Sequence, residues 1–315
     1  MTAAGWELLT EANIPAQIPQ LYEQADPDKP GMPVKPGDLG RYEVVFDAAT
    51  MAFLLDETIG TATQLDLALG YEANNIGTSY LGPDPFALLG SYQAASPLVT
   101  ITGNRSMPRG LATVKWDDEG VAPEPFTLIK DGVLVDYQTT REQAAWLAPY
   151  YQKTGKPIRS HGCAAAENAL TIPMQHMPNL ALAPSAAAVK LNDLVATVKD
   201  GILVTQGTTM ADFQARTGLL LGTLYEIKNG RVGSALQGGA VLYDSLDLWK
   251  HVVAVGGAPT QAVIASTMFP YTAGMNKRAG WYPVKGEPPQ QTSYSVQAVA
   301  ATITNQAVID PMRKA

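Results

Sequence analysis

The sequence predicts an α+β fold in which a mainly antiparallel β-sheet packs against one long helix. Apolar stretches interrupted by Asp-Gly or Asn-Gly recur along the chain, which is typical of β-hairpins. Residues 47–70 instead carry apolar side chains at helical spacing. Because 46% of the 315 residues are hydrophobic, the chain has enough apolar surface for a large core.

Three β-hairpins are expected, in residues 126–135, 195–204 and 224–232. Their turns are Asp131-Gly132, Asp200-Gly201 and Asn229-Gly230. These residue pairs readily adopt the positive φ angles of a type I′ turn, whose twist matches two paired antiparallel strands. The closing residues 293–309 alternate and are β-branched, so they predict a terminal strand.

The long helix is expected to start at Asp47, an N-cap residue type, and to stop at Gly70. Its apolar positions predict an amphipathic helix with one buried face. Asp56 and Glu57 are adjacent carboxylates on this helix. Neighbouring helical residues point about 100° apart, so these two side chains are not expected to act as one unit.

Composition and charge exclude several classes of protein. The net charge is -7 and the calculated pI is about 5.0, which is unfavourable for binding nucleic acid. No stretch approaches the roughly 18 apolar residues of a membrane span, and the N-terminus lacks the pattern of a secretory signal. The single cysteine, Cys163, cannot form an internal disulfide and fits a reducing compartment. We therefore expect a cytoplasmic protein.

The chain divides into two parts of different composition. Residues 1–39 are expected to form an N-terminal helical arm and linker, because a short helical pattern is followed by residues rich in Pro, Gly and Asp. Residues 40–315 form the predicted main domain, which begins with a strand at residues 42–46.

Residues 47–80 resemble the signature helix of the TldD/TldE (PmbA) metalloprotease family. In that family, His-Glu, three further residues and a second His precede a run that ends in Gly-Tyr-Glu-Ala-Asn and Gly-Thr-Ser. The sequence retains much of this pattern. The matching residues are Glu57, Gly60, Asp66, Leu69, Gly70, Tyr71, Glu72, Ala73, Asn74, Gly77, Thr78 and Ser79. The resemblance covers roughly residues 37–285 and implies the fold of the family's C-terminal domain, without its large N-terminal domain.

The resemblance also identifies where the zinc ligands of the family would lie. The two histidine positions hold Asp56 and Thr61, and the family's third ligand, a cysteine in a Cys-x-Lys stretch, corresponds to Met275. Hydrolytic zinc sites use three protein ligands, usually nitrogen, thiolate or carboxylate donors. A threonine hydroxyl and a thioether are poor substitutes. We therefore expect no zinc and no other cofactor at this site, and only Glu57, the general base implied by the resemblance, remains.

His176 is a second candidate catalytic residue. It lies in a stretch that resembles the family's Arg-Met-Thr-Asn loop beside the active-site groove, where His176 takes the arginine position and Met177 and Asn179 are retained. A histidine there would supply an acid or base close to Glu57. Cys163 is thirteen residues away and is expected to be a small buried hydrophobe rather than a nucleophile.

Two functions remain open on the sequence, besides a plain binding or structural role. The first is a non-catalytic subunit that pairs with an active, zinc-competent TldD-like metalloprotease subunit to bind or process peptides. The alternative is a divergent enzyme, a hydrolase or other acid/base catalyst acting on a peptide or small molecule through Glu57, Asp56 and His176. Either function predicts a dimer, with a second copy or with the zinc-competent subunit, and no contact with membrane or nucleic acid.

Overall fold

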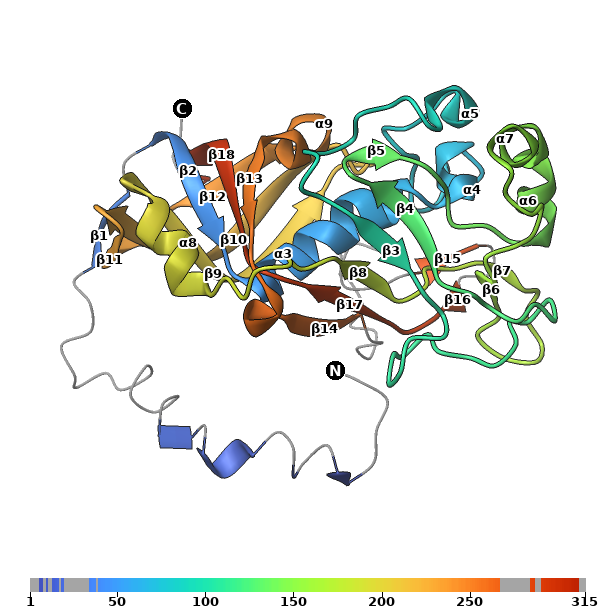
Figure 1. Cartoon of the computed structure of the whole chain (residues 1–315), viewed down its shortest axis with the longest axis horizontal. Coiled ribbons are helices and arrows are strands. Elements are labelled where there is room, and N and C mark those ends of the chain that lie inside the picture. Colours follow the sequence, from blue (N-terminus) through green and yellow to red (C-terminus); the bar gives the residue numbers. More distant parts are fainter. Residues whose placement is uncertain are drawn as a thin grey trace.

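The protein is described from a computed structural model that covers residues 6–7, 10, 13–16, 18–19, 34–37, 39–266, 284–286 and 290–311. Figure 1 shows two β-sheets with helix α3 (Ala48–Leu55) running between them. Most pairs of neighbouring strands are antiparallel, so the predicted α+β class with a mainly antiparallel sheet is confirmed.

The first sheet contains a closed ring of strands. Strand β2 pairs with β9 and β18, β10 pairs with β9 and β12, and β12 pairs with β18. Strands β1 and β11 extend this sheet from β10, and β13 pairs with β18. The strands are β1 (Val34–Pro36), β2 (Gly40–Phe46), β9 (Asp200–Ala211), β10 (Thr217–Lys228), β11 (Arg231–Gln237), β12 (Ala240–Asp244), β13 (Val252–Val255) and β18 (Ala301–Ile309).

The second sheet has the order β14-β17-β8-β3-β4-β5, and two short hairpins lie beside it. Its strands are β14 (Ala262–Ser266), β17 (Tyr294–Ala298), β8 (Leu180–Leu182), β3 (Ile101–Gly103), β4 (Phe126–Lys130) and β5 (Val133–Leu134). The hairpins are β6 (Ala164–Ala165) with β7 (Met174–Gln175), and β15 (Val284–Lys285) with β16 (Gln290–Gln291).

The helices are short. They are α4 (Leu65–Ala68), α5 (Pro85–Leu88), α6 (Arg141–Trp146), α7 (Ala148–Thr154), α8 (Leu191–Thr197) and α9 (Ser245–Leu248), with 3-10 turns at Trp249–His251 and Ala258–Thr260. Helix α3 continues as a π-helical turn over Asp56–Gly60. Within the described part of the chain, no helix is both long and apolar enough to cross a membrane.

The signature helix differs from the sequence-based prediction in two ways. It packs against β9 of one sheet and against β14 and β17 of the other, so its side chains are buried almost all round rather than on one face. It also ends before Gly70, because Gln64 is extended and forms a β-bridge with Gln138 before α4 begins. A helix between two sheets needs apolar residues on both sides, which is why more than the one predicted face is buried.

Two of the three predicted hairpins are confirmed. Asp131 and Asn229 have positive φ angles, as do the glycines that follow them, and each pair joins antiparallel strands. The third prediction was wrong, because Gly201 lies inside β9, which follows α8. A β-carbon on Gly201 would lie 2.3 Å from the Glu43 carbonyl oxygen, so this glycine permits the close approach of β2 rather than a turn.

The last predicted strand is two strands, β17 and β18, which belong to different sheets. Strand β1 lies in the predicted N-terminal linker and pairs in parallel with β11. Helix α6 begins at a capping box between Thr140 and Gln143.

Candidate functional site

The signature helix begins at a cap and contains one widened turn. The Asp47 side chain accepts a hydrogen bond from the Thr50 backbone amide at 2.8 Å. Further along, the Thr61 backbone amide donates to the Asp56 carbonyl, five residues back, which is the π-helical pattern. Asp56 and Thr61, the two positions that correspond to the family's histidines, are therefore one π turn apart and lie close together.

Close packing explains why Gly60 stands inside this turn. A β-carbon at Gly60 would lie 2.7 Å from a methyl carbon of Leu180 and 3.0 Å from the Met177 sulfur. The Gly60 carbonyl accepts a hydrogen bond of 2.6 Å from the Gln138 amide. Thr58 anchors the same turn, because its hydroxyl accepts a hydrogen bond of 2.8 Å from the indole N–H of buried Trp249.

Asp56 points into the core toward the second sheet. It is 4% exposed, and the Tyr294 hydroxyl of β17 donates to its Oδ1 at 2.8 Å. Burial raises the pKa of Asp56 to about 7, although the Tyr294 hydrogen bond opposes the rise. The protonated form of Asp56 is therefore much more favoured than that of an exposed aspartate.

Glu57 points to the first sheet instead. Its Oε1 accepts a hydrogen bond of 3.0 Å from the backbone amide of Ala211 in β9. Asp47 and Thr50 contact the same strand, where their side chains accept bonds from the amides of Gln206 and Gly207. The helix thus satisfies amides along the edge of β9, and Glu57 takes part in this structural contact.

The residues at the two described ligand positions, Asp56 and Thr61, do not fit a hydrolytic zinc site. The Thr61 hydroxyl donates to the Asp56 carbonyl at 3.0 Å, while Asp56 is buried against Tyr294. Met275 lies outside the described residues. Across the part of the chain that the structure describes, no three His, Cys, Asp or Glu side chains are grouped to hold a metal ion.

His176 is buried, and its imidazole has no hydrogen-bond partner. It is 2% exposed, and neither ring nitrogen finds a partner in the described structure. Burial, together with the nearby charges of Lys285 and Arg105, lowers the pKa of His176 to about 3. The imidazole is therefore neutral, and no hydrogen bond joins it to Asp56 or Glu57. Cys163, whose carbonyl accepts from the His176 amide, is fully buried, and burial raises its pKa to about 12.

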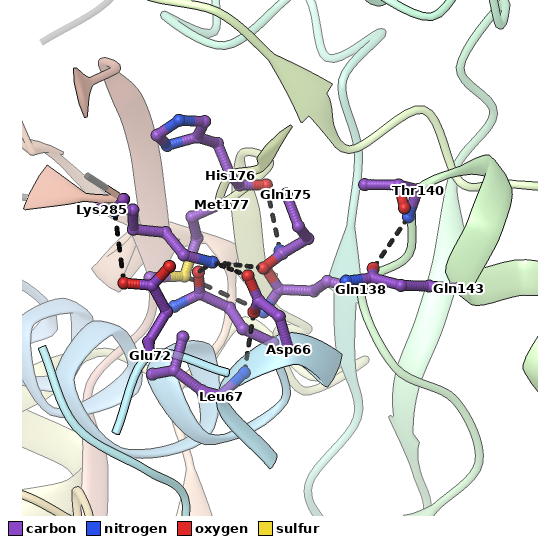
Figure 2. Close-up of polar contacts among 12 residues, drawn as sticks. Asp66, Leu67, Glu72, Gln138, Thr140, Gln143, Gln175, His176, Met177 and Lys285 are labelled. Atoms are coloured by element: carbon purple, nitrogen blue, oxygen red, sulfur yellow. Dashed lines mark hydrogen bonds and ion pairs between the residues drawn. The ribbon is translucent and has the colours of Figure 1, made fainter. Parts of the chain in front are cut away.

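A buried polar cluster lies beside these residues and was not predicted from the sequence. Figure 2 shows Lys285 of β15 with its ammonium group directed at Asp66 and Gln175. It donates to a carboxylate oxygen of Asp66, to Gln175 at 2.7 Å and to Gln64 at 3.1 Å. Burial raises the pKa of Asp66, while the Lys285 charge opposes that rise. In the same figure the His176 ring points away from the cluster.

Retained motif residues hold the same short segment in place. The Glu72 carboxylate accepts from the Gly286 amide at 3.2 Å, and the Asn75 side chain donates to the Gly286 carbonyl at 3.2 Å. Asp66 thus binds Lys285 and Glu72 binds Gly286, each more than two hundred positions away in sequence. The motif could have indicated these two acids, but nothing local distinguishes Lys285 from other lysines.

The comparisons with known proteins agree with this fold. Residues 39–276 match the model of the PmbA/TldA metallopeptidase C-terminal domain. The chain belongs to the PmbA/TldD family. It is 24% identical over 224 residues to a metalloprotease of Methanocaldococcus jannaschii, covering 70% of this chain and 44% of the relative. It is 23% identical over 215 residues to the metalloprotease TldD homolog of Haemophilus influenzae, covering 68% of this chain and 40% of the relative.

The crystal structure of TldE from Thermococcus kodakarensis has the same fold. It superposes with a TM-score of 0.59 at 17% identity, covering 88% of this chain and 52% of that one. The chain therefore spans about half or less of the length of each of these family members.

Proposed function

We propose that this chain is a non-catalytic subunit of the PmbA/TldD family that pairs with a zinc-competent TldD-like subunit to bind or process peptides. The environment of the signature helix carries the proposal. Asp56 accepts from Tyr294, Glu57 accepts from the Ala211 amide, and Thr61 donates to a helix carbonyl. Asp56 and Glu57 thus join the helix to the two sheets, while Asp66 and Glu72 hold the segment at residues 285–286.

Zinc content tests the first half of the proposal. The purified chain should contain far less than one zinc per chain by elemental analysis, because a threonine and a buried carboxyl with a raised pKa make a weak site. The triple substitution Asp56→His, Thr61→His and Met275→Cys should raise the zinc content, since it restores the family's donors. One tightly held zinc in the unaltered chain would refute the proposal.

Co-purification tests the second half. A tagged chain should retain a family member that carries both histidines when the two are co-expressed. A matched control is a family member whose own two histidines are changed to alanine, which should still bind because zinc does not form the contact. Recovery of the tagged chain alone in both cases would count against a pairing role.

One observation favours the alternative, acid/base chemistry. A carboxyl whose pKa lies near 7 is suited to exchange a proton at neutral pH. Against it, Asp56 and Glu57 bond to different sheets, and no hydrogen bond joins the His176 ring to either of them. If the alternative holds, Glu57→Gln abolishes a measurable turnover while the thermal melt stays nearly unchanged.

A further inference from the structure

A pocket of about 440 Å³ lies between the end of helix α4 and the turn that joins β9 to β10. Its lining comes from three segments, within residues 68–70, 78–83 and 214–216. Asp56, Thr61 and His176 are not part of this lining. Pockets of roughly 300–1,000 Å³ suit small ligands, so this one has room for a small organic molecule.

Hydrogen bonds hold the walls of this pocket in place without a ligand. The backbone amides of Thr78 and Tyr80 donate to the carbonyls of residues 213–214 at 2.8 and 2.9 Å. The Asp212 carboxylate accepts from backbone amides of the β9–β10 turn, including the Arg216 amide at 2.9 Å. Because these walls are ordered in advance, a ligand would lose little affinity to the cost of ordering them.

Arg216 is the charged residue of the described lining, and the protein uses little of its hydrogen-bonding capacity. Its side chain is 47% exposed, and its Nε lies 3.4 Å from an oxygen of Asp244, which is a long contact. Within the described part of the chain, neither terminal nitrogen of Arg216 is bonded to an acceptor. The fork of a guanidinium matches the two oxygens of a carboxylate, so these nitrogens can hold such a group.

Tyr92 is a second unused donor, and it lies close to Arg216. Its hydroxyl is buried and has no hydrogen-bond partner among the described residues. Burial raises the pKa of Tyr92 and the Asp244 charge adds to the rise, while the Arg216 charge opposes it. The phenol therefore keeps its proton at neutral pH. The Lys250 ammonium lies 5.4 Å from the centre of the Tyr92 ring and adds positive charge. These groups favour an anionic ligand over a cationic one.

We propose that this pocket binds a small ligand that carries a carboxylate on an apolar stem, and that Arg216 holds the carboxylate. The stem would lie against Leu69 and Pro83, which also line the pocket. Both the C-terminal residue of a peptide and a free aliphatic acid have this chemistry. Asp244 competes with the ligand for Arg216 and so limits the affinity. The site uses none of the zinc-motif positions, so its test is independent of zinc content and of co-purification.

NMR titration of the full chain tests the site with N-acetyl-alanyl-leucine, the C-terminal amide of that dipeptide, and hexanoate. The dipeptide acid should shift the amide signals of residues 78–82 and 214–216. Its amide should bind at least about tenfold more weakly, because it lacks the charge that Arg216 recognises. Tighter binding of the dipeptide acid than of hexanoate assigns a peptide C-terminus as the ligand, and equal binding assigns a free acid. Failure of both acids to bind, or equal binding of the dipeptide acid and its amide, overturns the proposal.

Substitutions test Arg216 as the group that holds the carboxylate. Arg216→Ala should raise the dissociation constant of the bound acid at least about tenfold. Arg231→Ala is the matched control and should leave it unchanged, because Arg231 is exposed in β11 outside the pocket. Asp244→Asn should lower the dissociation constant, since it removes the competing charge yet keeps an oxygen for the Leu246 amide at the start of α9. Thermal melts confirm that each variant is folded. An affinity that Arg216→Ala leaves unchanged, or that Asp244→Asn weakens, overturns the proposal.

Discussion

Asp56 and Asp136 are buried to nearly the same extent, but their pKa values are shifted in opposite directions. They are 4% and 2% exposed. Asp136 accepts from the Tyr151 hydroxyl at 2.8 Å and from Lys156 at 2.9 Å, and His161 lies 3.3 Å away. Burial raises its pKa, yet His161 and Lys156 outweigh burial and the net pKa is lowered. Asp56 has only the neutral Tyr294 hydroxyl among the described residues, and its pKa rises.

The comparison shows that burial alone does not decide whether a carboxylate stays charged. Asp66 is the intermediate case, since it faces one cation, Lys285, in a fully buried site. A neighbouring cation favours the charged form of a buried carboxylate, as at Asp136 and Asp66. Asp56 has no such cation among the described residues, so its pKa rises toward neutral pH. The predictions below remove those partners or the acids themselves.

The largest effect is expected when Asp66 loses its cation. Lys285→Met should destabilise the protein by about 4 kcal/mol, because it leaves a buried carboxylate uncompensated and two amide oxygens without a donor. Chemical denaturation measures the change in the free energy of unfolding. Adding Asp66→Asn to Lys285→Met should recover part of the loss, and a double variant that is no more stable than Lys285→Met would show that charge is not the cause.

The next effect concerns pH. The folded pKa of Asp56 lies near 7, above its ordinary value of 3.8, so its contribution to stability is complete below about pH 4 and is lost as pH rises to 7. A shift of about three pKa units corresponds to a loss of about 4 kcal/mol at most. The folded pKa of His176, near 3, lies below its ordinary 6.5, so its contribution is lost as pH falls through the same range. In the unaltered protein, Asp56 makes the stability fall as pH rises, and His176 makes it rise, so the two contributions oppose each other.

Variants separate the two slopes. Stability should rise more steeply with pH in Asp56→Asn than in the unaltered protein, and His176→Gln should show the opposite change. Denaturation curves at pH 4, 5, 6 and 7 measure both. Parallel profiles for the three proteins would mean that neither group titrates as the structure indicates.

A smaller effect is expected at Asp136. Asp136→Asn should cost about 2 kcal/mol, because the amide keeps some hydrogen bonds but loses the attraction to Lys156, whose side chain is 35% exposed and partly screened by water. Asp247→Asn is the control, since that carboxylate is 55% exposed beside His251. It should change stability by less than about 0.5 kcal/mol. Equal losses in the two variants would contradict the contrast with Asp56.

The smallest effect is expected at Glu57. Glu57→Gln should change stability by less than about 1 kcal/mol, because the amide oxygen can still accept from the Ala211 amide. Glu57→Ala removes that acceptor and should speed hydrogen exchange at Ala211. Exchange that is unchanged in Glu57→Ala would show that the amide is protected in another way.

The sequence by itself determined the features that depend on neighbouring residues. The Asp131-Gly132 and Asn229-Gly230 turns follow from backbone preferences, and the cap at Thr140 follows from side chains three residues apart. The family motif likewise identified Asp56, Glu57 and Thr61 as the positions to inspect. The catalytic roles of Glu57 and His176, and the loss of zinc ligands at Asp56, Thr61 and Met275, stay predictions.

Only the tertiary structure decided where those side chains point and what they contact. The Asp200-Gly201 pair predicts a turn, but Gly201 is required because β2, far away in sequence, packs too closely for a β-carbon. Asp56 and Glu57 are adjacent in sequence, yet Asp56 is hydrogen-bonded to β17 and Glu57 to β9. Lys285 meets Asp66 only after the chain folds. Burial and charge pairing arise from residues that are distant along the chain, so local preferences carry no information about them.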